Sequence, residues 1–320
     1  MQKKLQHTLI ASVFACFCFP VFSQPFAYVP NEKDGTVTVI DTQTDEVVKL
    51  LPAKGRLGKK VQAAAIHSTN QKLYVVVRDK NAVSVVDTQK NKQTALIKVG
   101  DEPEGIDISP DGKLLAACLE EENAVALVDL QTNKVKHTIA TQGKNPEHCV
   151  FSPDQQWLLA SNEESNDVDV INLKSLKSEH LIAATKHPRG IGFSPDGQWA
   201  YVANEAASLL EIVSTTDWKV QANIKVGLRS NGVKVNADGN RIYVSNGGDH
   251  NVSVIDTPGR EVIATVPVGQ RPWNMALTPD GKKLYVANGR SNNVSVIDTQ
   301  TNTKIKDIPV GNLPWGVVIH

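Results

Sequence analysis

Short runs of alternating apolar and polar residues repeat along most of the chain, and they predict β-strands rather than helices. The phrase Val-Ser-Val-Ile-Asp, followed by a Thr-rich turn, recurs in seven copies with a nearly constant period of about 42 residues. The copies end at Asp41, Asp87, Asp129, Asn172, Ser214, Asp256 and Asp298. In the clearest copy the alternation predicts four strands, at residues 273–278, 283–287, 293–298 and 303–309. Four-stranded antiparallel units at such a period are typical of β-propeller blades.

The two ends of the chain each carry part of one blade. Residues 26–30 match a second strand that has no first strand before it, and residues 314–319 match a first strand that has nothing after it. Pairing the C-terminal strand with the N-terminal strands would complete a blade and remove exposed sheet edges. The sequence therefore predicts an all-β, seven-bladed β-propeller of four-stranded antiparallel blades, as one domain over residues 24–320.

Residues 1–23 have the pattern of a cleaved signal peptide. Lys3 and Lys4 precede a short apolar run, and a cleavage position lies near Ser23. No other apolar run is long enough to cross a bilayer, so we expect a monomeric periplasmic or secreted protein without a membrane span or lipid anchor. Cleavage removes two lysines and no acid from a chain with 34 basic and 34 acidic residues. The slightly acidic remainder argues against nucleic acid binding.

The phrase Tyr-Val-x-Asn begins at Tyr28, Tyr201, Tyr243 and Tyr285, and the chain resembles the YVTN-type β-propeller family over residues 26–320. The repeated Val-Gly-x-x-Pro phrase and the ending at residues 310–318 are similar to those of periplasmic propellers associated with PQQ-dependent alcohol catabolism. This resemblance implies a propeller in a quinoprotein setting, with PQQ or haem as candidate cofactors. Seven-bladed propellers of similar repeat also include sugar lactonases.

One position of the repeat varies from blade to blade. It precedes the repeated glycine of the first strand and is expected to lie at the mouth of the central channel. A purely structural position would stay alike across the repeats, so we interpret this mouth ring as a binding site. The mouth ring consists of Gln62, Glu104, Glu147, Arg189, Asn231, Trp273 and Trp315.

Charge divides the same face. Acidic residues gather in blades three and four, and Arg229, Arg271 and Arg290 lie in later blades. Fields of opposite sign can orient a charged ligand or a protein partner. We predict that the mouth ring, His148 and these arginines form the site. Solvated loop charges, and two tryptophans that only fill space, are the alternatives.

His148 replaces the repeated glycine beside Glu147 and near Cys149, a combination that could bind a metal ion. Strand alternation sends neighbouring side chains to opposite sides, so we predict no metal site. Cys118 and Cys149 lie in apolar strand patterns, and we expect both to be buried. An oxidising compartment would permit a disulfide between them.

The leading functional hypothesis is a non-enzymatic scaffold. It would bind a periplasmic protein or an anionic or planar small molecule, as an accessory to quinoprotein oxidation. The variable, charge-divided channel mouth on a regular scaffold favours this interpretation. Residues 24–320 contain no recognisable catalytic motif, but propellers assemble their sites from loops that are distant in sequence, so an enzyme stays open. The first alternative is a lactonase-like hydrolase that uses Glu104, Glu147, His148 and Arg189 for acid–base chemistry and oxyanion stabilisation. The second is a protein that holds haem or PQQ between the tryptophans and arginines.

Overall fold

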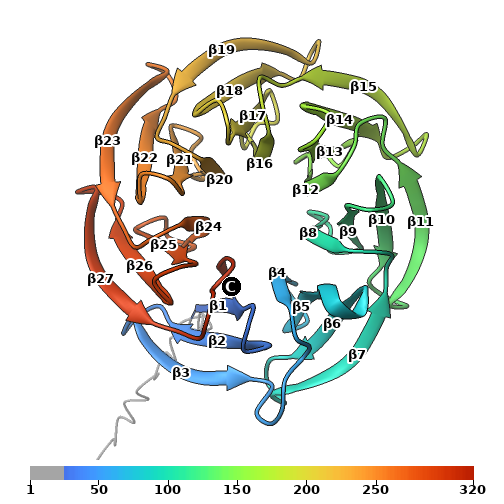
Figure 1. Ribbon diagram of the computed structural model, residues 1–320, viewed down its shortest axis with the longest axis vertical. Helices are drawn as coiled ribbons and strands as arrows, with labels where there is room; N and C mark the ends of the chain where they lie inside the picture. The colour runs from blue at the N-terminus through green and yellow to red at the C-terminus, as the bar shows by residue number, and fades with distance from the viewer. Residues whose placement is uncertain (1–24) are drawn as a thin grey trace, which may run out of the picture.

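Seven four-stranded antiparallel sheets surround a central channel in the computed structural model, which describes residues 25–320 (Figure 1). The seven-bladed β-propeller is therefore confirmed. The predicted signal peptide lies outside the described residues. Within residues 25–320, no helix is long and apolar enough to span a membrane.

The blades follow one another along the chain, and blade one contains both chain ends. It consists of β28 (Val318–Ile319), β1 (Phe26–Asn31), β2 (Thr36–Asp41) and β3 (Glu46–Leu51). Blade two has β4 (Val61–Ile66), β5 (Lys72–Val77), the short 3-10 helix η1 (Arg78–Lys80), β6 (Ala82–Asp87) and β7 (Lys92–Lys98). Blade three has β8 (Pro103–Ile108), β9 (Leu114–Leu119), β10 (Ala124–Asp129) and β11 (Lys134–Ala140). Blade four has β12 (Pro146–Phe151), β13 (Trp157–Asn162), β14 (Asp167–Asn172) and β15 (Lys177–Ala183).

The remaining three blades complete the ring. Blade five has β16 (Pro188–Phe193), β17 (Trp199–Asn204), β18 (Leu209–Ser214) and β19 (Lys219–Lys225). Blade six has β20 (Ser230–Val235), β21 (Arg241–Asn246), β22 (Asn251–Asp256) and β23 (Glu261–Pro267). Blade seven has β24 (Pro272–Leu277), β25 (Lys283–Asn288), β26 (Asn293–Asp298) and β27 (Thr303–Pro309). The first strand of each blade lines the channel, as Figure 1 shows.

The turns that join first and second strands have the predicted geometry. In the Ser-Pro-Asp-Gly turn of blade three, Gly112 has a φ of +72°, a conformation that side chains disfavour. Its N–H donates to the Ser109 carbonyl at 2.8 Å, and the Ser109 hydroxyl donates to Asp111 at 2.8 Å. In five blades the turn after the third strand is held by an aspartate, as at Asp87, which accepts from the Lys90 N–H at 2.8 Å. These aspartates have the structural role predicted for them.

The closure of the ring uses fewer paired residues than the sequence predicts. β28 pairs with β1 only at Ala27–Ile319 and Tyr28–Val318, followed by an isolated bridge between Asn31 and Pro314. The Trp315 N–H donates to the Pro30 carbonyl at 3.0 Å. The other first strands also break register near their start, as β8 does after Pro103. After this irregular start, the second residues of β4, β8, β16, β20 and β24 line the pocket at the channel mouth.

The apolar core lies between the blades. The second and third strands are buried along most of their length, whereas the fourth strands form the exposed rim. Cys118 and Cys149 are free thiols, buried in one cluster between blades three and four, so the expected burial is confirmed. Across the closure, the Lys283 ammonium of blade seven pairs with Asp45 of blade one at 2.8 Å.

Candidate functional site

The predicted mouth ring surrounds a cavity of about 190 Å³ at one end of the channel. The cavity brings together eight of the eleven predicted site residues, and adds Glu32. Its predicted members are Gln62, Glu104, His148, Arg189, Asn231, Arg271, Trp273 and Trp315. We call this space the mouth cavity.

A second ring surrounds the first, and the sequence analysis missed it. It consists of the residue that directly follows each second strand, where the chain turns onto the loop face. In blade order these residues are Glu32, Arg78, Glu120, Glu163, Glu205, Gly247 and Gly289. Their variation between blades is the same signal that identified the mouth ring, so alignment on the second strands would have found them.

Arg78 of the second ring binds three glutamates of blade three. Its guanidinium lies 2.6 Å from Glu104 and 2.5 Å from both Glu102 and Glu120. Glu104 and Glu120 are both 7% exposed, so these ion pairs are largely shielded from water. Arg78 therefore anchors the acidic half of the site to blade two.

Arg189 has the corresponding role on the other side of the mouth. It donates to Glu147, to Glu163 at 2.9 Å and to Glu205 at 2.8 Å. Glu205 also accepts from Arg271 Nη2 at 3.0 Å, so one carboxylate holds two arginines against the mouth cavity. Arg271 Nη1 is buried and has no hydrogen-bond partner among the described residues. Such an unsatisfied donor needs an explanation, and Arg271 itself lines the mouth cavity.

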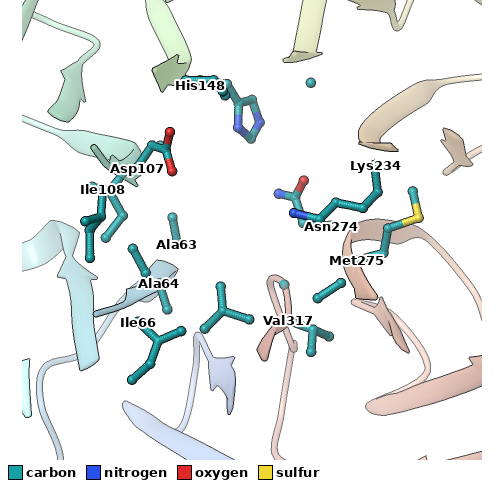
Figure 2. A pocket seen from close by; sticks show the side chains of 18 of the residues that line it. Ala63, Ala64, Ile66, Asp107, Ile108, His148, Lys234, Asn274, Met275 and Val317 are labelled. Carbon is teal, nitrogen blue, oxygen red and sulfur yellow. The ribbon is translucent and has the colours of Figure 1, made fainter. Parts of the chain in front are cut away.

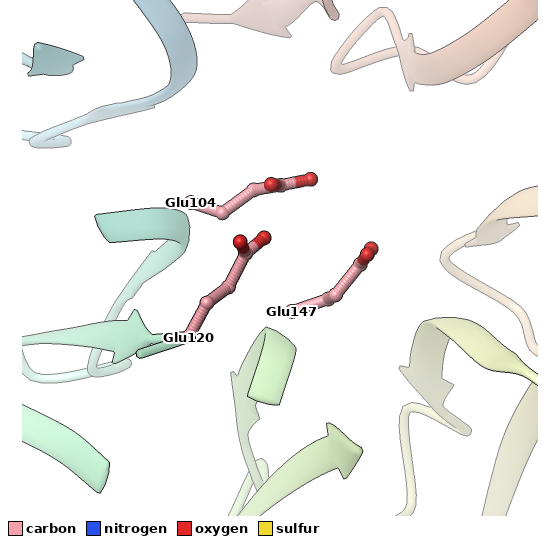
Figure 3. A group of neighbouring side chains, drawn as sticks. All are labelled: Glu104, Glu120 and Glu147. Atoms are coloured by element: carbon pink, nitrogen blue, oxygen red, sulfur yellow. The ribbon is translucent and has the colours of Figure 1, made fainter. Parts of the chain in front are cut away.

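Glu104, Glu120 and Glu147 converge, with carboxylate oxygens within 4.8 Å of one another (Figure 3). Burial, together with a hydrogen bond to Glu104 and its charge, raises the pKa of Glu120 to about 9. Burial and the charge of Glu104 also raise the pKa of Glu147 well above its usual value. Carboxyl groups this close cannot all ionise, so the trio retains protons at neutral pH.

A metal ion is a weaker interpretation of this trio. Its oxygens are close enough to share a cation, but Arg78 and Arg189 already contact its carboxylates. The guanidinium groups supply the positive charge that a cation would bring. The metal ligands considered from the sequence, namely Glu147, His148 and Cys149, do not face one another. Cys149 Sγ lies 3.5 Å from the Gly105 carbonyl, whereas the His148 ring faces the channel (Figure 2).

His148 and Trp315 form the floor of the mouth cavity, with ring centroids 5.7 Å apart. Burial, reinforced by the positive charge of Arg189, lowers the pKa of His148 to about 4. The imidazole is therefore neutral at pH 7, and one ring nitrogen is free to accept a proton.

The two tryptophans do not form a matched platform. Trp315 is only 8% exposed and packs with Ala63 and Val76, while the half-buried Trp273 lies against the edge of this cluster. A Cβ at Gly289 would come within 2.5 Å of the Trp273 ring, so glycine in the second ring makes room for the indole. Space filling accounts for Trp315, and Trp273 remains accessible to a ligand.

Arg229 and Arg290 lie outside the mouth cavity. Together with Arg271 they line a neighbouring pocket of about 530 Å³, whose single carboxylate, Glu205, already binds two arginines. On the opposite side, Glu147 and Glu163 line an acidic pocket of about 490 Å³. The charge division predicted from the sequence is present, and the two halves meet at Arg189 and Glu205.

Replacing Glu120 by Gln should flatten the pH dependence of stability. Between the usual glutamate pKa of 4.5 and about 9, the folded protein keeps this proton and the unfolded chain releases it. The wild-type free energy of unfolding therefore falls as pH rises through this range. Glutamine at position 120 mimics the protonated acid, so the variant should not lose this part of the free energy of unfolding as pH rises. Urea unfolding at several pH values measures the slope, and an unchanged slope would contradict the protonated state of Glu120.

The fold and site define a class: seven-bladed propellers with a charged, half-buried site at the channel mouth. A family model described as "Lactonase, 7-bladed beta-propeller" matches residues 17–140 and 172–309. The chain belongs to this lactonase family. The unmatched residues 141–171 contain Glu147 and His148, so their roles rest on geometry. No curated protein matches the chain.

Several solved structures share the fold. A chain of hydrazine synthase from Kuenenia stuttgartiensis is 25% identical, with a TM-score of 0.74, over 90% of this chain and 99% of that one. A functionally unknown protein from Desulfotomaculum acetoxidans is 17% identical, with a TM-score of 0.81, over 92% and 98%. A putative 6-phosphogluconolactonase from Bacteroides uniformis is 17% identical, with a TM-score of 0.77, over 93% and 100%.

Proposed function

We propose that the protein is a lactonase-like hydrolase that opens anionic lactones in the mouth cavity. The observation that carries the proposal is the mouth cavity itself, which brings Arg189 and Arg271 together with the neutral His148. Membership in the lactonase family supports the reaction class. It favours the hydrolase over the non-enzymatic scaffold that the sequence analysis preferred.

The residues of the cavity supply each requirement of lactone hydrolysis. Water adds to the lactone carbonyl carbon while His148 accepts its proton. The negative charge that develops on the carbonyl oxygen is stabilised by the guanidinium groups of Arg189 and Arg271. The ring C–O bond then breaks, and the proton that Glu120 holds beside the cavity passes to the leaving alkoxide. The proton on His148 then returns to Glu120 through water, so that one water is consumed and a hydroxy acid is released.

The arginine pocket indicates the charge of the substrate. Arg229, Arg271 and Arg290 line it beside the mouth cavity, and guanidinium groups bind phosphate and carboxylate with paired hydrogen bonds. A lactone that carries such a group could place its ring over His148 and its anionic end in this pocket. The putative 6-phosphogluconolactonase among the similar structures has a name consistent with this class.

The test is a panel of sugar-acid lactones, with and without a phosphate or carboxylate group, followed by acid release in a pH-stat. We expect ring opening above the buffer rate, and faster opening of the anionic members. Arg290→Gln should reduce the difference in ring-opening rate between anionic and neutral lactones. If no member of the panel opens faster than in buffer, the protein is not a lactonase of this kind.

The pH profile of kcat/KM should be bell-shaped. The acidic limb reports protonation of His148, whose pKa is about 4. The alkaline limb reports loss of the proton held by Glu120, whose pKa is about 9. Glu120→Gln, which cannot donate this proton to the leaving alkoxide, should lower kcat/KM and remove the alkaline limb while leaving the acidic limb in place. Initial rates corrected for spontaneous hydrolysis measure both limbs, and a profile without an acidic limb would argue against His148 as the base.

The scaffold and cofactor hypotheses stay predictions. None of the relatives described above is named as a quinoprotein accessory or as a haem or PQQ carrier. The export and monomer predictions likewise remain expectations.

A further inference from the structure

A second chamber lies in the channel and extends to the Ser-Pro-Asp-Gly turn of blade three, where Ser109, Pro110 and Gly112 line it. Its volume is about 460 Å³, and small apolar residues of the first strands form most of its wall. His148 and Trp315 line both this chamber and the mouth cavity. The ring pair therefore separates two compartments, and we call the second one the lower chamber.

The fifth residue of the first strands carries the unusual chemistry of the lower chamber. In five blades this position holds a small apolar residue, namely Ala65, Val150, Gly192, Ala276 or Val318. In the other two it holds Asp107, in blade three, and Lys234, in blade six. Repeats that fold with Ala, Gly or Val at this position do not need a charge there, so the two charges require another explanation.

Asp107 and Lys234 both face the channel (Figure 2). Asp107 Oδ2 accepts a hydrogen bond from the Phe151 N–H at 2.9 Å, which fixes the carboxylate on the wall. Among residues 25–320, the Lys234 ammonium forms no ion pair or hydrogen bond, and the His148 ring forms no hydrogen bond. The Asn274 side chain also points into the chamber (Figure 2). Four polar side chains from four blades thus line one largely apolar space.

Each charge is only partly compensated by the other. Burial raises the pKa of Asp107 to about 6, despite the Phe151 N–H and the charge of Lys234. Burial lowers the pKa of Lys234, and the charge of Asp107 offsets only part of this shift. By solvent exposure, Asp107 is half-buried and Lys234 is exposed to the channel. A ligand that carries the two opposite charges would be electrostatically complementary to this pair.

We propose that the lower chamber binds a small zwitterion of the α-amino acid type. Its ammonium group lies against Asp107, and its carboxylate lies against Lys234 and Asn274. A simple anion would be repelled by Asp107 and a simple cation by Lys234, so the charge pair selects a ligand that carries both signs. The volume falls within the range of about 300–1,000 Å³ that is usual for small-molecule sites. The residues proposed to hold this ligand take no part in the proposed lactone chemistry, although His148 lines both spaces.

The experiment uses the full mature protein and saturation-transfer NMR, with dissociation constants from titration. The probes are L-alanine, L-proline and β-alanine. L-alaninamide, which has only the ammonium, and N-acetyl-L-alanine, which has only the carboxylate, are the charge controls. We expect at least one zwitterion to bind and both single-charge analogues to bind at least about tenfold more weakly.

Variants locate the binding in the lower chamber. Lys234→Gln and Asp107→Asn should each weaken zwitterion binding at least about tenfold. Lys234→Gln leaves the Phe151 hydrogen bond intact, so it remains informative if Asp107→Asn is unstable. Arg290→Gln, in the arginine pocket, should bind like the wild type. Absence of binding by all three zwitterions, equal binding of N-acetyl-L-alanine, or unchanged binding in Lys234→Gln would overturn the proposal.

Discussion

Deletion of residues 314–320 is expected to abolish cooperative folding. The deletion removes β28, the pairing with β1 and the hydrogen bond from Trp315 to Pro30. It also removes the buried side chains of Trp315 and Val317. Loss of a buried tryptophan alone costs about 3–5 kcal/mol, a large share of the ~5–15 kcal/mol that stabilises a typical domain. Blade one would be left with three strands and an open edge.

Urea unfolding and circular dichroism measure this effect. The Trp315→Ala variant is the matched control, because it loses the indole and keeps the strand. We expect Trp315→Ala to be weakened but still cooperative, and the deletion variant to unfold over a broad range or to aggregate. A deletion variant as stable as Trp315→Ala would mean that pairing of the chain ends contributes little.

Replacement of Arg189 by Met should have the largest effect of any single change in the mouth cavity. Arg189 binds Glu147, Glu163 and Glu205, and Glu147 is only 3% exposed. Breaking a buried ion pair from one side costs about 3–5 kcal/mol, and without Arg189 the carboxylates of Glu163 and Glu205 lose the guanidinium that both of them bind. The same change removes a stabiliser of the oxyanion, so ring opening should fall by about 10²–10³.

Arg241→Met is the control for this prediction. Arg241 pairs with Asp256 near the surface, where both side chains are about a third exposed, and such pairs contribute roughly 0–1 kcal/mol. Denaturant unfolding of the two variants compares them directly. Equal stability losses in Arg189→Met and Arg241→Met would show that the ion-pair network around Arg189 is not a special feature of the site.

The repeat made the fold predictable in detail. Aligned copies of one blade gave strand positions that agree with β24–β27 to about one residue, and the incomplete units at the two ends gave the closure. The variable residue types at one position of the first strand also identified the mouth ring. Equivalent positions of the seven blades lie together around the channel. Periodicity carries this information, since each blade repeats the same backbone geometry.

The contacts within the site could not be predicted in the same way. Arg78 and Glu205 extend from the second ring into the mouth, and long side chains reach partners that backbone register does not specify. The tryptophans illustrate the same limit. Trp273 and Trp315 occupy equivalent positions, yet one packs over Gly289 and the other is buried beside Val76. Neighbouring residues, some of them from other blades, determine how each indole packs.

The most direct test of the account compares ring opening by two histidine variants. His148→Gln removes the proposed base from the floor of the mouth cavity. His67→Gln removes a histidine on the opposite face, where its ring contacts the Gly112 carbonyl at 3.0 Å. With the best lactone of the panel, the account predicts a fall in kcat/KM of about 10²–10⁴ for His148→Gln and wild-type rates for His67→Gln, at similar melting temperatures. Wild-type turnover by a folded His148→Gln variant would contradict the assignment of catalysis to the mouth cavity.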